Sequence, residues 1–177
     1  FMSIRRFADF AAGLSNADVP PDTLHAAKRA VIDWFASTLP GGMVPPATML
    51  VEAFADSSGT ALLYPSGRTT DARTAAFING AAAHTIEFDD IYRDGLYHPA
   101  APVISAVMAV AQALGLGGDA FLRAVIAGYE VSNRMAVAVN PAHYEYWHTT
   151  GTIGTFGAAA GAGVALGLDG ETIGHAM

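Results

Sequence analysis

The spacing of apolar side chains along the chain predicts a protein built mainly of α-helices. The clearest segment is 22–39, where apolar residues recur at intervals of three and four positions from Leu24 to Phe35. Asp22 follows two prolines and is predicted to be the N-cap of this helix, because its side chain can accept a free backbone N–H. The run Pro40-Gly41-Gly42 predicts its end.

Similar patterns, separated by proline and glycine, predict the remaining elements. Further helices are expected at about 3–14, 46–55, 71–88, 99–114, 118–139 and 149–166, with a fragmentary helix up to residue 177. The segment Thr60–Tyr64 reads as a short extended piece, and Pro65-Ser66-Gly67 as the turn after it. We therefore predict an all-α, bundle-like domain with at most one short hairpin.

The glycine-rich segment 151–163 (GTIGTFGAAAGAG) allows two other interpretations, which the pattern disfavours. It matches neither of the common glycine-rich nucleotide-binding motifs. The range 149–168 holds twenty residues without a charge, but it lacks the aromatic and basic flanks of a membrane span. Glycines at intervals of three and four residues are typical of tight helix packing, so we predict that structural role and no membrane partner.

Composition and charge exclude several classes of function. The chain has 52% hydrophobic and 14% charged residues and a net charge of −7, with no basic run that could follow a phosphate backbone. It contains no cysteine, which rules out disulfides, zinc ribbons and thiol catalysis. The first fourteen residues lack the apolar run and cleavage site of a signal peptide. We expect a cytoplasmic protein that does not bind nucleic acid.

The segment 84–99 (HTIEFDDIYRDGLYHP) concentrates titratable residues between two apolar, small-residue segments. Ionisable groups near a core are costly to desolvate unless they have a partner or a use, so a functional site is one interpretation and a solvated loop the other. If the preceding helix continues, it places His84, Glu87 and either Asp90 or Ile91 on one face. Such a set can form a general acid/base pair or an internal ion pair, and the spacing does not separate the two. We take His84 and Asp90 as candidate substrate-binding residues.

Two histidines precede predicted helix starts, His98 before Pro99 and His148 before Thr149. Free N–H groups and the helix dipole favour carboxylates at such places. With the hydroxyls of Thr149, Thr150 and Thr152, they would suit a substrate that carries several carboxylates, although each histidine can also simply cap its own helix. Ligands for a metal are available in His84, Asp89 or Asp90, and His98, but their spacing matches no strong template, and metal-free chemistry is expected.

Five stretches of the chain resemble the MmgE/PrpD family, which includes 2-methylcitrate dehydratase, cis-aconitate decarboxylase and iminodisuccinate epimerase. They are HAAKRAVIDWFAS, TAAFINGAAAHTIEFDD, HPAAPVISAVMAVAQALG, AVIAGYEVSNR and WHTTGTIGTFGAAAGAGVALGLDGE, in family order and over nearly the whole chain. The resemblance implies that residues 1–177 form a helical domain, that a second, α+β domain is missing from this sequence, and that the protein is a homodimer without a cofactor.

The resemblance also implies a reaction and three catalytic positions. Family members act on small di- or tricarboxylates, without a required metal, by removing a proton next to a carboxylate. By position, Glu87 matches the acidic residue of H-x-x-[DE]-F-D-D, His98 the His-Pro histidine, and His148 the histidine before T-G-T. We expect a dehydratase-type lyase, and the alternatives are an epimerase, isomerase or decarboxylase, or a non-catalytic dimerisation module. Ile91 and the sequence HPAAPV depart from the family pattern and disfavour methylcitrate as the substrate.

Overall fold

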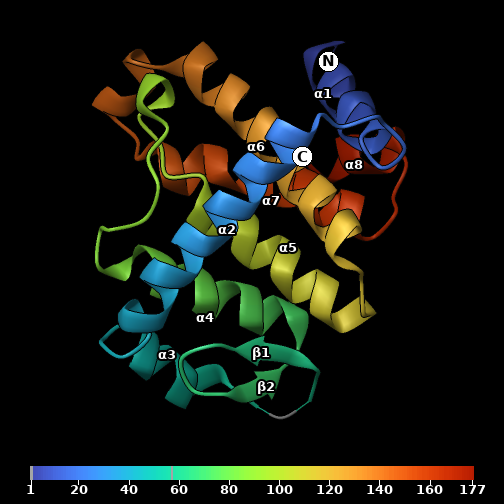
Figure 1. The fold of residues 1–177 in the computed structure, drawn as a ribbon. Helices are drawn as coiled ribbons and strands as arrows, with labels where there is room; N and C mark the ends of the chain where they lie inside the picture. The colour runs from blue at the N-terminus through green and yellow to red at the C-terminus, as the bar shows by residue number, and fades with distance from the viewer. Residues whose placement is uncertain (1, 57) are drawn as a thin grey trace.

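The computed structural model describes residues 2–56 and 58–177, which form eight α-helices and one two-stranded hairpin (Figure 1). The elements are α1 (Met2–Gly13), α2 (Pro21–Gly41), α3 (Ala47–Phe54), β1 (Ala61–Leu63), β2 (Arg68–Thr70), α4 (Ala72–Thr85), α5 (Ala100–Leu114), α6 (Gly118–Val139), α7 (Thr149–Ala165) and α8 (Gly170–Ala176). Short 3-10 helices occupy Arg93–Gly95 and Ala142–Glu145. The prediction of an all-α domain is confirmed.

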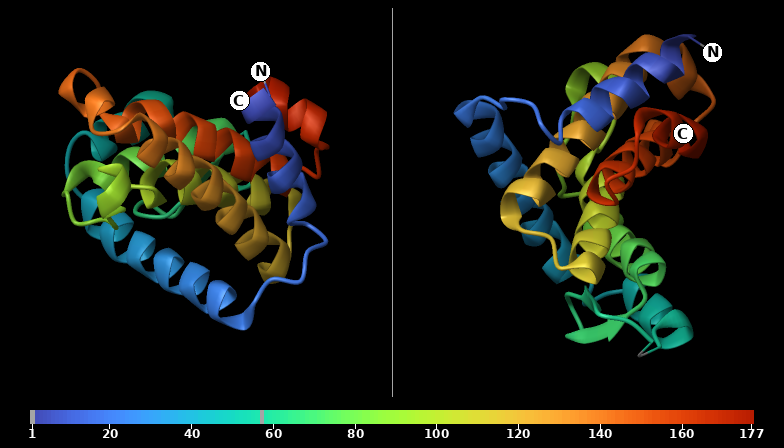
Figure 2. Two further views of the ribbon diagram at one scale, coloured as in Figure 1. Left: turned by 90° about the horizontal axis from the view of Figure 1, so that it is seen from above. Right: turned by 90° about the vertical axis from the view of Figure 1, so that its right-hand side faces the viewer.

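Helix α5 lies at the centre of the fold. It packs against α2, α4, α6 and α7 and against strand β1. More than half of its residues are buried, because neighbours surround it on most sides. Helices α1 and α8 lie side by side at one end of the molecule, together with both termini, while α3 and the hairpin lie at the other end (Figures 1 and 2).

Glycines bring α7 into close contact with α5 and α6. A Cβ atom on Gly157 would lie 2.6 Å from Ser132 Oγ of α6 and 2.8 Å from Val103 Cγ2 of α5. A Cβ on Gly161 would lie 2.6 Å from Val107 Cγ2. No larger residue fits these positions without displacing its neighbours, so the predicted packing role is confirmed for Gly157 and Gly161, whereas Gly151 has no neighbour within 4 Å of an added Cβ. Within the described chain, no helix combines the length and apolar character needed to cross a bilayer.

Helix α2 anchors itself to α5 through Trp34. The indole is fully buried, and its Nε1 donates a hydrogen bond of 2.9 Å to Ser105 Oγ. The rings of Phe35 and Tyr64 pack edge to face against it, with centroid distances of 5.0 and 5.4 Å. A buried indole whose N–H has a partner fixes the angle at which α2 crosses the core.

Both predicted ends of α2 need correction. The helix begins at Pro21, so the N-cap residue is Pro20, and Asp22 lies inside the first turn, where its charge still favours the helix dipole. At the other end the helix continues through Pro40 to Gly41, because a proline removes only one hydrogen bond there. The N–H of Gly42 then closes the last turn on Thr38 O at 2.9 Å.

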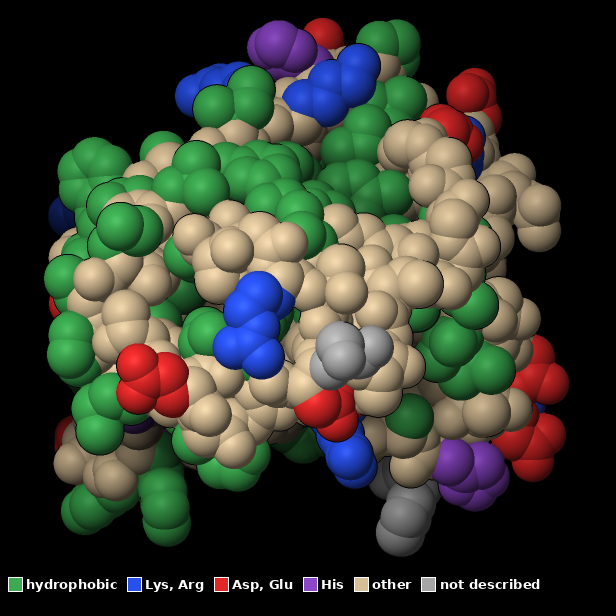
Figure 3. Space-filling view, turned by 90° about the horizontal axis from the view of Figure 1, so that it is seen from below, with side chains coloured by type: hydrophobic (Ala, Val, Ile, Leu, Met, Phe, Trp, Pro, Cys, Tyr) green, Lys and Arg blue, Asp and Glu red, His purple; other side chains and the backbone are tan. Residues whose placement is uncertain are grey.

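The predicted extended segment is strand β1, which pairs with β2 in antiparallel register with Ala61 opposite Thr70. The face at this end of the molecule has a broad area of apolar side chains with scattered charges (Figure 3). Met49 and Phe54 of α3 and Phe77 of α4 are among the large apolar side chains that are exposed. The Phe54 and Phe77 rings pack edge to face, 6.2 Å apart, and join α3 to α4.

Candidate functional site

The helix that carries His84 ends earlier than predicted, and this rearranges the candidate site. Helix α4 stops at Thr85, and Glu87 has the left-handed backbone conformation, with φ of +52°. The chain turns there, so the prediction that His84, Glu87 and Asp90 share one helical face is wrong. The physical reason lies in the following aspartates, which leave the helix so that Asp89 contacts His84 and His98, and Asp90 contacts Ala100 and Tyr129.

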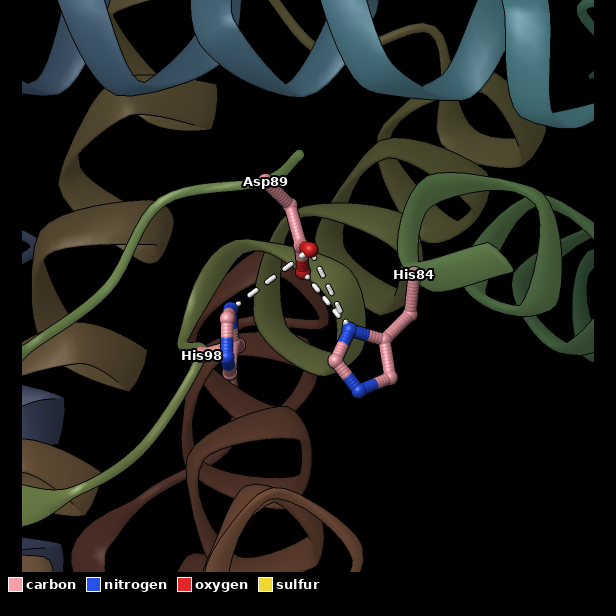
Figure 4. A group of neighbouring side chains, drawn as sticks. All are labelled: His84, Asp89 and His98. Carbon is pink, nitrogen blue, oxygen red and sulfur yellow. Dashed lines mark hydrogen bonds and ion pairs between the residues drawn. The ribbon is translucent and has the colours of Figure 1, made fainter. Parts of the chain in front are cut away.

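Asp89 lies between the imidazoles of His84 and His98 (Figure 4). Its Oδ2 is 3.0 Å from His84 Nδ1, and its Oδ1 is 3.5 Å from His98 Nδ1. The Asp89 side chain is completely buried, whereas the two imidazoles are 24% and 17% exposed. A buried carboxylate thus stands behind two rings that solvent can reach, an arrangement that orients an imidazole for proton transfer.

The hydrogen bond with Asp89 raises the pKa of His84, although partial burial opposes the shift. Glu87 adds to the effect, with its Oε1 3.9 Å from His84 Nε2. The Glu87 side chain itself is 74% exposed. His84 therefore favours its cationic form more strongly than a free histidine does, and this form attracts a carboxylate ligand.

His148 joins the same cluster from the start of α7. It is the N-cap residue of that helix, and its ring stacks on His84 with a centroid distance of 5.8 Å and an interplanar angle of 22°. The His84 and His98 rings are 4.9 Å apart. Three predicted site residues from three separate elements therefore lie side by side, at the end of α4 and the starts of α5 and α7.

The predicted threonine hydroxyls lie at the start of α7, where they bond to the protein itself. Thr150 Oγ1 accepts the backbone N–H of His98 at 3.1 Å, which joins the starts of α5 and α7. Thr149 Oγ1 accepts from Asn140 Nδ2 at 3.1 Å, and Thr152 Oγ1 lies 2.7 Å from His143 Nε2. In this conformation the hydroxyls hold the histidine-bearing segments in place. Their predicted role in substrate binding stays a prediction.

Asp90 lies apart from the imidazoles and holds the start of α5. Its Oδ1 accepts the N–H of Ala100 at 2.9 Å, and its Oδ2 accepts the hydroxyl of Tyr129 at 2.9 Å. Burial raises the pKa of Asp90 to about 6, against the effect of these two hydrogen bonds. These contacts fix the start of α5, two residues after His98. The predicted role of Asp90 in substrate binding stays a prediction.

Two residues near the site are absent from the predicted catalytic and substrate-binding residues. The sequence suggests Asp89 only as an alternative metal ligand, yet it is the buried carboxylate that both imidazoles face. The adjacent aspartates of the FDD sequence were a signal, but the pattern does not show which of them faces the histidines. His143, the second missed residue, reaches the site through its contact with Thr152.

Comparison with known proteins shows which family this chain belongs to. A family model described as the MmgE/PrpD N-terminal domain matches residues 5–177. Similar curated proteins include a cis-aconitate decarboxylase-like protein, oryM, of Aspergillus oryzae, which is 29% identical over 88% of this chain and 34% of its own length. A cis-aconitate decarboxylase of Aspergillus terreus is 27% identical over 95% of this chain and 36% of its own.

A human protein named cis-aconitate decarboxylase is 30% identical over 92% of this chain and 35% of its own length. The chain thus spans about a third of the length of the curated relatives that it matches.

Proposed function

Because the chain belongs to the MmgE/PrpD family, we propose that it provides the helical domain of a lyase that acts on a small di- or tricarboxylate. The observation that carries the proposal is the cluster of His84, His98 and His148 around the buried Asp89. A carbon next to a carboxylate is a weak acid, so its chemistry needs both proton transfer and stabilisation of negative charge.

The contacts suggest a division of roles within this cluster. His98 is partly exposed and His148 is exposed, each at a helix start. Both can exchange a proton with a bound acid, and such proton transfer typically raises the rate by ~10²–10⁴-fold. The raised pKa of His84 favours a cation that binds a substrate carboxylate. Glu87 extends into solvent beside His84, where it can share or orient that proton. No metal or organic cofactor takes part in the proposed reaction.

Among the reactions of this class, the names of the relatives favour decarboxylation over the dehydration expected from sequence. Three matched proteins are called cis-aconitate decarboxylases or similar to them. In such a step the bond between carbon and the leaving carboxylate breaks and carbon dioxide departs. The electron pair stays on the carbon skeleton, and a histidine returns a proton to it. Dehydration remains the second candidate, because the family resemblance that supports it covers the same residues.

The proposal can be tested by proton NMR in deuterated buffer with cis-aconitate and citrate as separate substrates. We expect loss of the cis-aconitate signals and a new, deuterium-labelled vinyl product, together with release of carbon dioxide. His98→Gln should abolish turnover, whereas His25→Gln, at an exposed position of α2, should not change it. Full turnover by His98→Gln would contradict the assignment, and conversion of citrate alone would favour dehydration.

A second measurement separates an enzyme from a non-catalytic dimerisation module. We expect cis-aconitate to shift the imidazole NMR signals of the wild type, because the acid binds among the histidines. A module would self-associate without any such shift. We also propose that the protein is a homodimer, as the family resemblance implies, and light scattering would give its mass.

A further inference from the structure

The set of atoms around Asp89 is also a set of metal ligands. One carboxylate oxygen of Asp89 and one ring nitrogen each of His84 and His98 lie within 4.8 Å of one another. Two imidazoles with one carboxylate favour borderline transition metals such as Zn²⁺ over Mg²⁺ or Ca²⁺, which prefer oxygen ligands. We propose that these three residues form a binding site for a divalent transition-metal ion and that Zn²⁺ is the preferred ion.

The spacing of the three groups fits such an ion. Bonds of about 2.0–2.2 Å in a tetrahedral zinc site place neighbouring ligand atoms roughly 3.3–3.6 Å apart. The Asp89 oxygens lie 3.0 Å from His84 Nδ1 and 3.5 Å from His98 Nδ1. In Figure 4 both Nδ1 atoms face the carboxylate. Small ring rotations are enough to admit an ion between them.

The polar environment favours a cation at this point. The Asp89 carboxylate is fully buried, where a charge is costly unless it is paired and hydrogen-bonded, and His84 provides its hydrogen bond. His98 Nδ1 is also buried and has no hydrogen-bond partner among the described residues. An ion would supply that nitrogen with a partner and neutralise the carboxylate more fully than one shared proton does.

The ion would have a functional consequence, which, unlike the binding itself, depends on the proposed function. Coordination occupies His98 Nδ1 and replaces the hydrogen bond between His84 and Asp89. With these nitrogens bound to the ion, neither imidazole could take the part proposed for it in the reaction. Zinc should therefore inhibit the reaction, and a chelator should restore it.

Binding is measured first, without any substrate. The chelator-treated chain is titrated with Co²⁺, whose visible absorption reports tetrahedral coordination, and then with Zn²⁺ by calorimetry. We expect one ion per chain and displacement of Co²⁺ by Zn²⁺. Asp89→Asn and His84→Gln each alter a direct ligand and should weaken binding by at least about 10- to 100-fold, the usual loss when only an outer-shell partner is removed. His175→Gln, at an exposed position of α8, should bind as the wild type does.

Two results would overturn the metal site. One is the absence of stoichiometric binding by wild-type protein, and the other is unchanged binding by both Asp89→Asn and His84→Gln. Circular dichroism of each metal-free variant shows whether it is folded. If Asp89→Asn is unfolded, the binding affinity of His84→Gln, a change at a partly exposed position, decides the test. Because Co²⁺ absorption needs no turnover, its outcome is independent of whether the proposed lyase activity is found.

Discussion

The Tyr129 hydroxyl donates a 2.9 Å hydrogen bond to Asp90, whose other oxygen accepts the N–H of Ala100 at the start of α5. One carboxyl group therefore joins α6, the loop after α4 and the helix that follows His98. The bond also lies in a largely buried place, where an unsatisfied polar group is costly. The position of His98 thus depends on a side chain two elements away.

The raised pKa of Asp90 makes stability depend on pH. Its folded-state pKa is about 6 against 3.8 for the free group, so its contribution to stability is fully present below pH 3.8 and is lost as pH rises through 6. Between pH 4 and 7, Asp90→Asn should gain up to roughly 3 kcal/mol in unfolding free energy relative to wild type. Urea unfolding at several pH values measures this, and a difference that does not vary with pH would contradict it.

Removal of the Tyr129 hydroxyl should destabilise the protein. Tyr129→Phe leaves Asp90 Oδ2 without its donor, and we expect a loss of about 1–3 kcal/mol in unfolding free energy at pH 7. The matched control is Tyr146→Phe, because Tyr146 is 79% exposed and should tolerate the change. Equal stability of the two variants would show that the Tyr129 bond contributes nothing.

Two glycines of α7 should respond in opposite directions to alanine. Gly157→Ala places a methyl group 2.6 Å from Ser132 Oγ and should lower the unfolding free energy by about 1–3 kcal/mol. Gly151 has no atom within 4 Å of the added methyl group, so Gly151→Ala should raise stability by up to about 1 kcal/mol through helix propensity. Thermal unfolding of both variants tests the order, and a stable Gly157→Ala would refute the close packing.

The left-handed backbone of Glu87 predicts a difference between two truncations. Glycine adopts a φ of +52° without steric cost, whereas the Cβ of alanine keeps the steric cost that Glu87 has. Glu87→Gly should therefore be more stable than Glu87→Ala by about 1 kcal/mol. Both variants lack the carboxylate and should lose turnover alike. Chemical denaturation compares their stabilities, and a more stable Glu87→Ala would mean that residue 87 does not hold this conformation in solution.

The long helices could be predicted because the pattern that identifies each one lies within its own stretch of sequence. The apolar period and the flanking prolines and glycines place the segment 118–139 within one helix, and the structure has α6 at Gly118–Val139. The end of α4 could not be predicted in this way. The helical pattern continues to about residue 88, but the hydrogen bonds of Asp89 to His84 and of Asp90 to Ala100 need a chain that has left the helix.

The candidate site was predictable in its parts but not in its arrangement. His98 and His148 stand out in the sequence because each precedes a helix start. The stacking of His148 on His84 depends on how α7 packs against the core, which no local pattern encodes. For the same reason the sequence did not distinguish the buried Asp89, which faces two imidazoles, from Asp90, which binds a helix start.

The glycine contacts of α7 also limit how a substrate preference of the proposed enzyme could be redesigned. They fix the helices that begin after His98 and His148, so mutations in these interfaces would damage the fold before they changed selectivity. Residue libraries for directed evolution are better placed at the exposed positions of the loops 86–97 and 140–147 that do not contact the site. There, Ile91 and Trp147 have 66% and 62% of their surface exposed and can vary in size at little energetic cost.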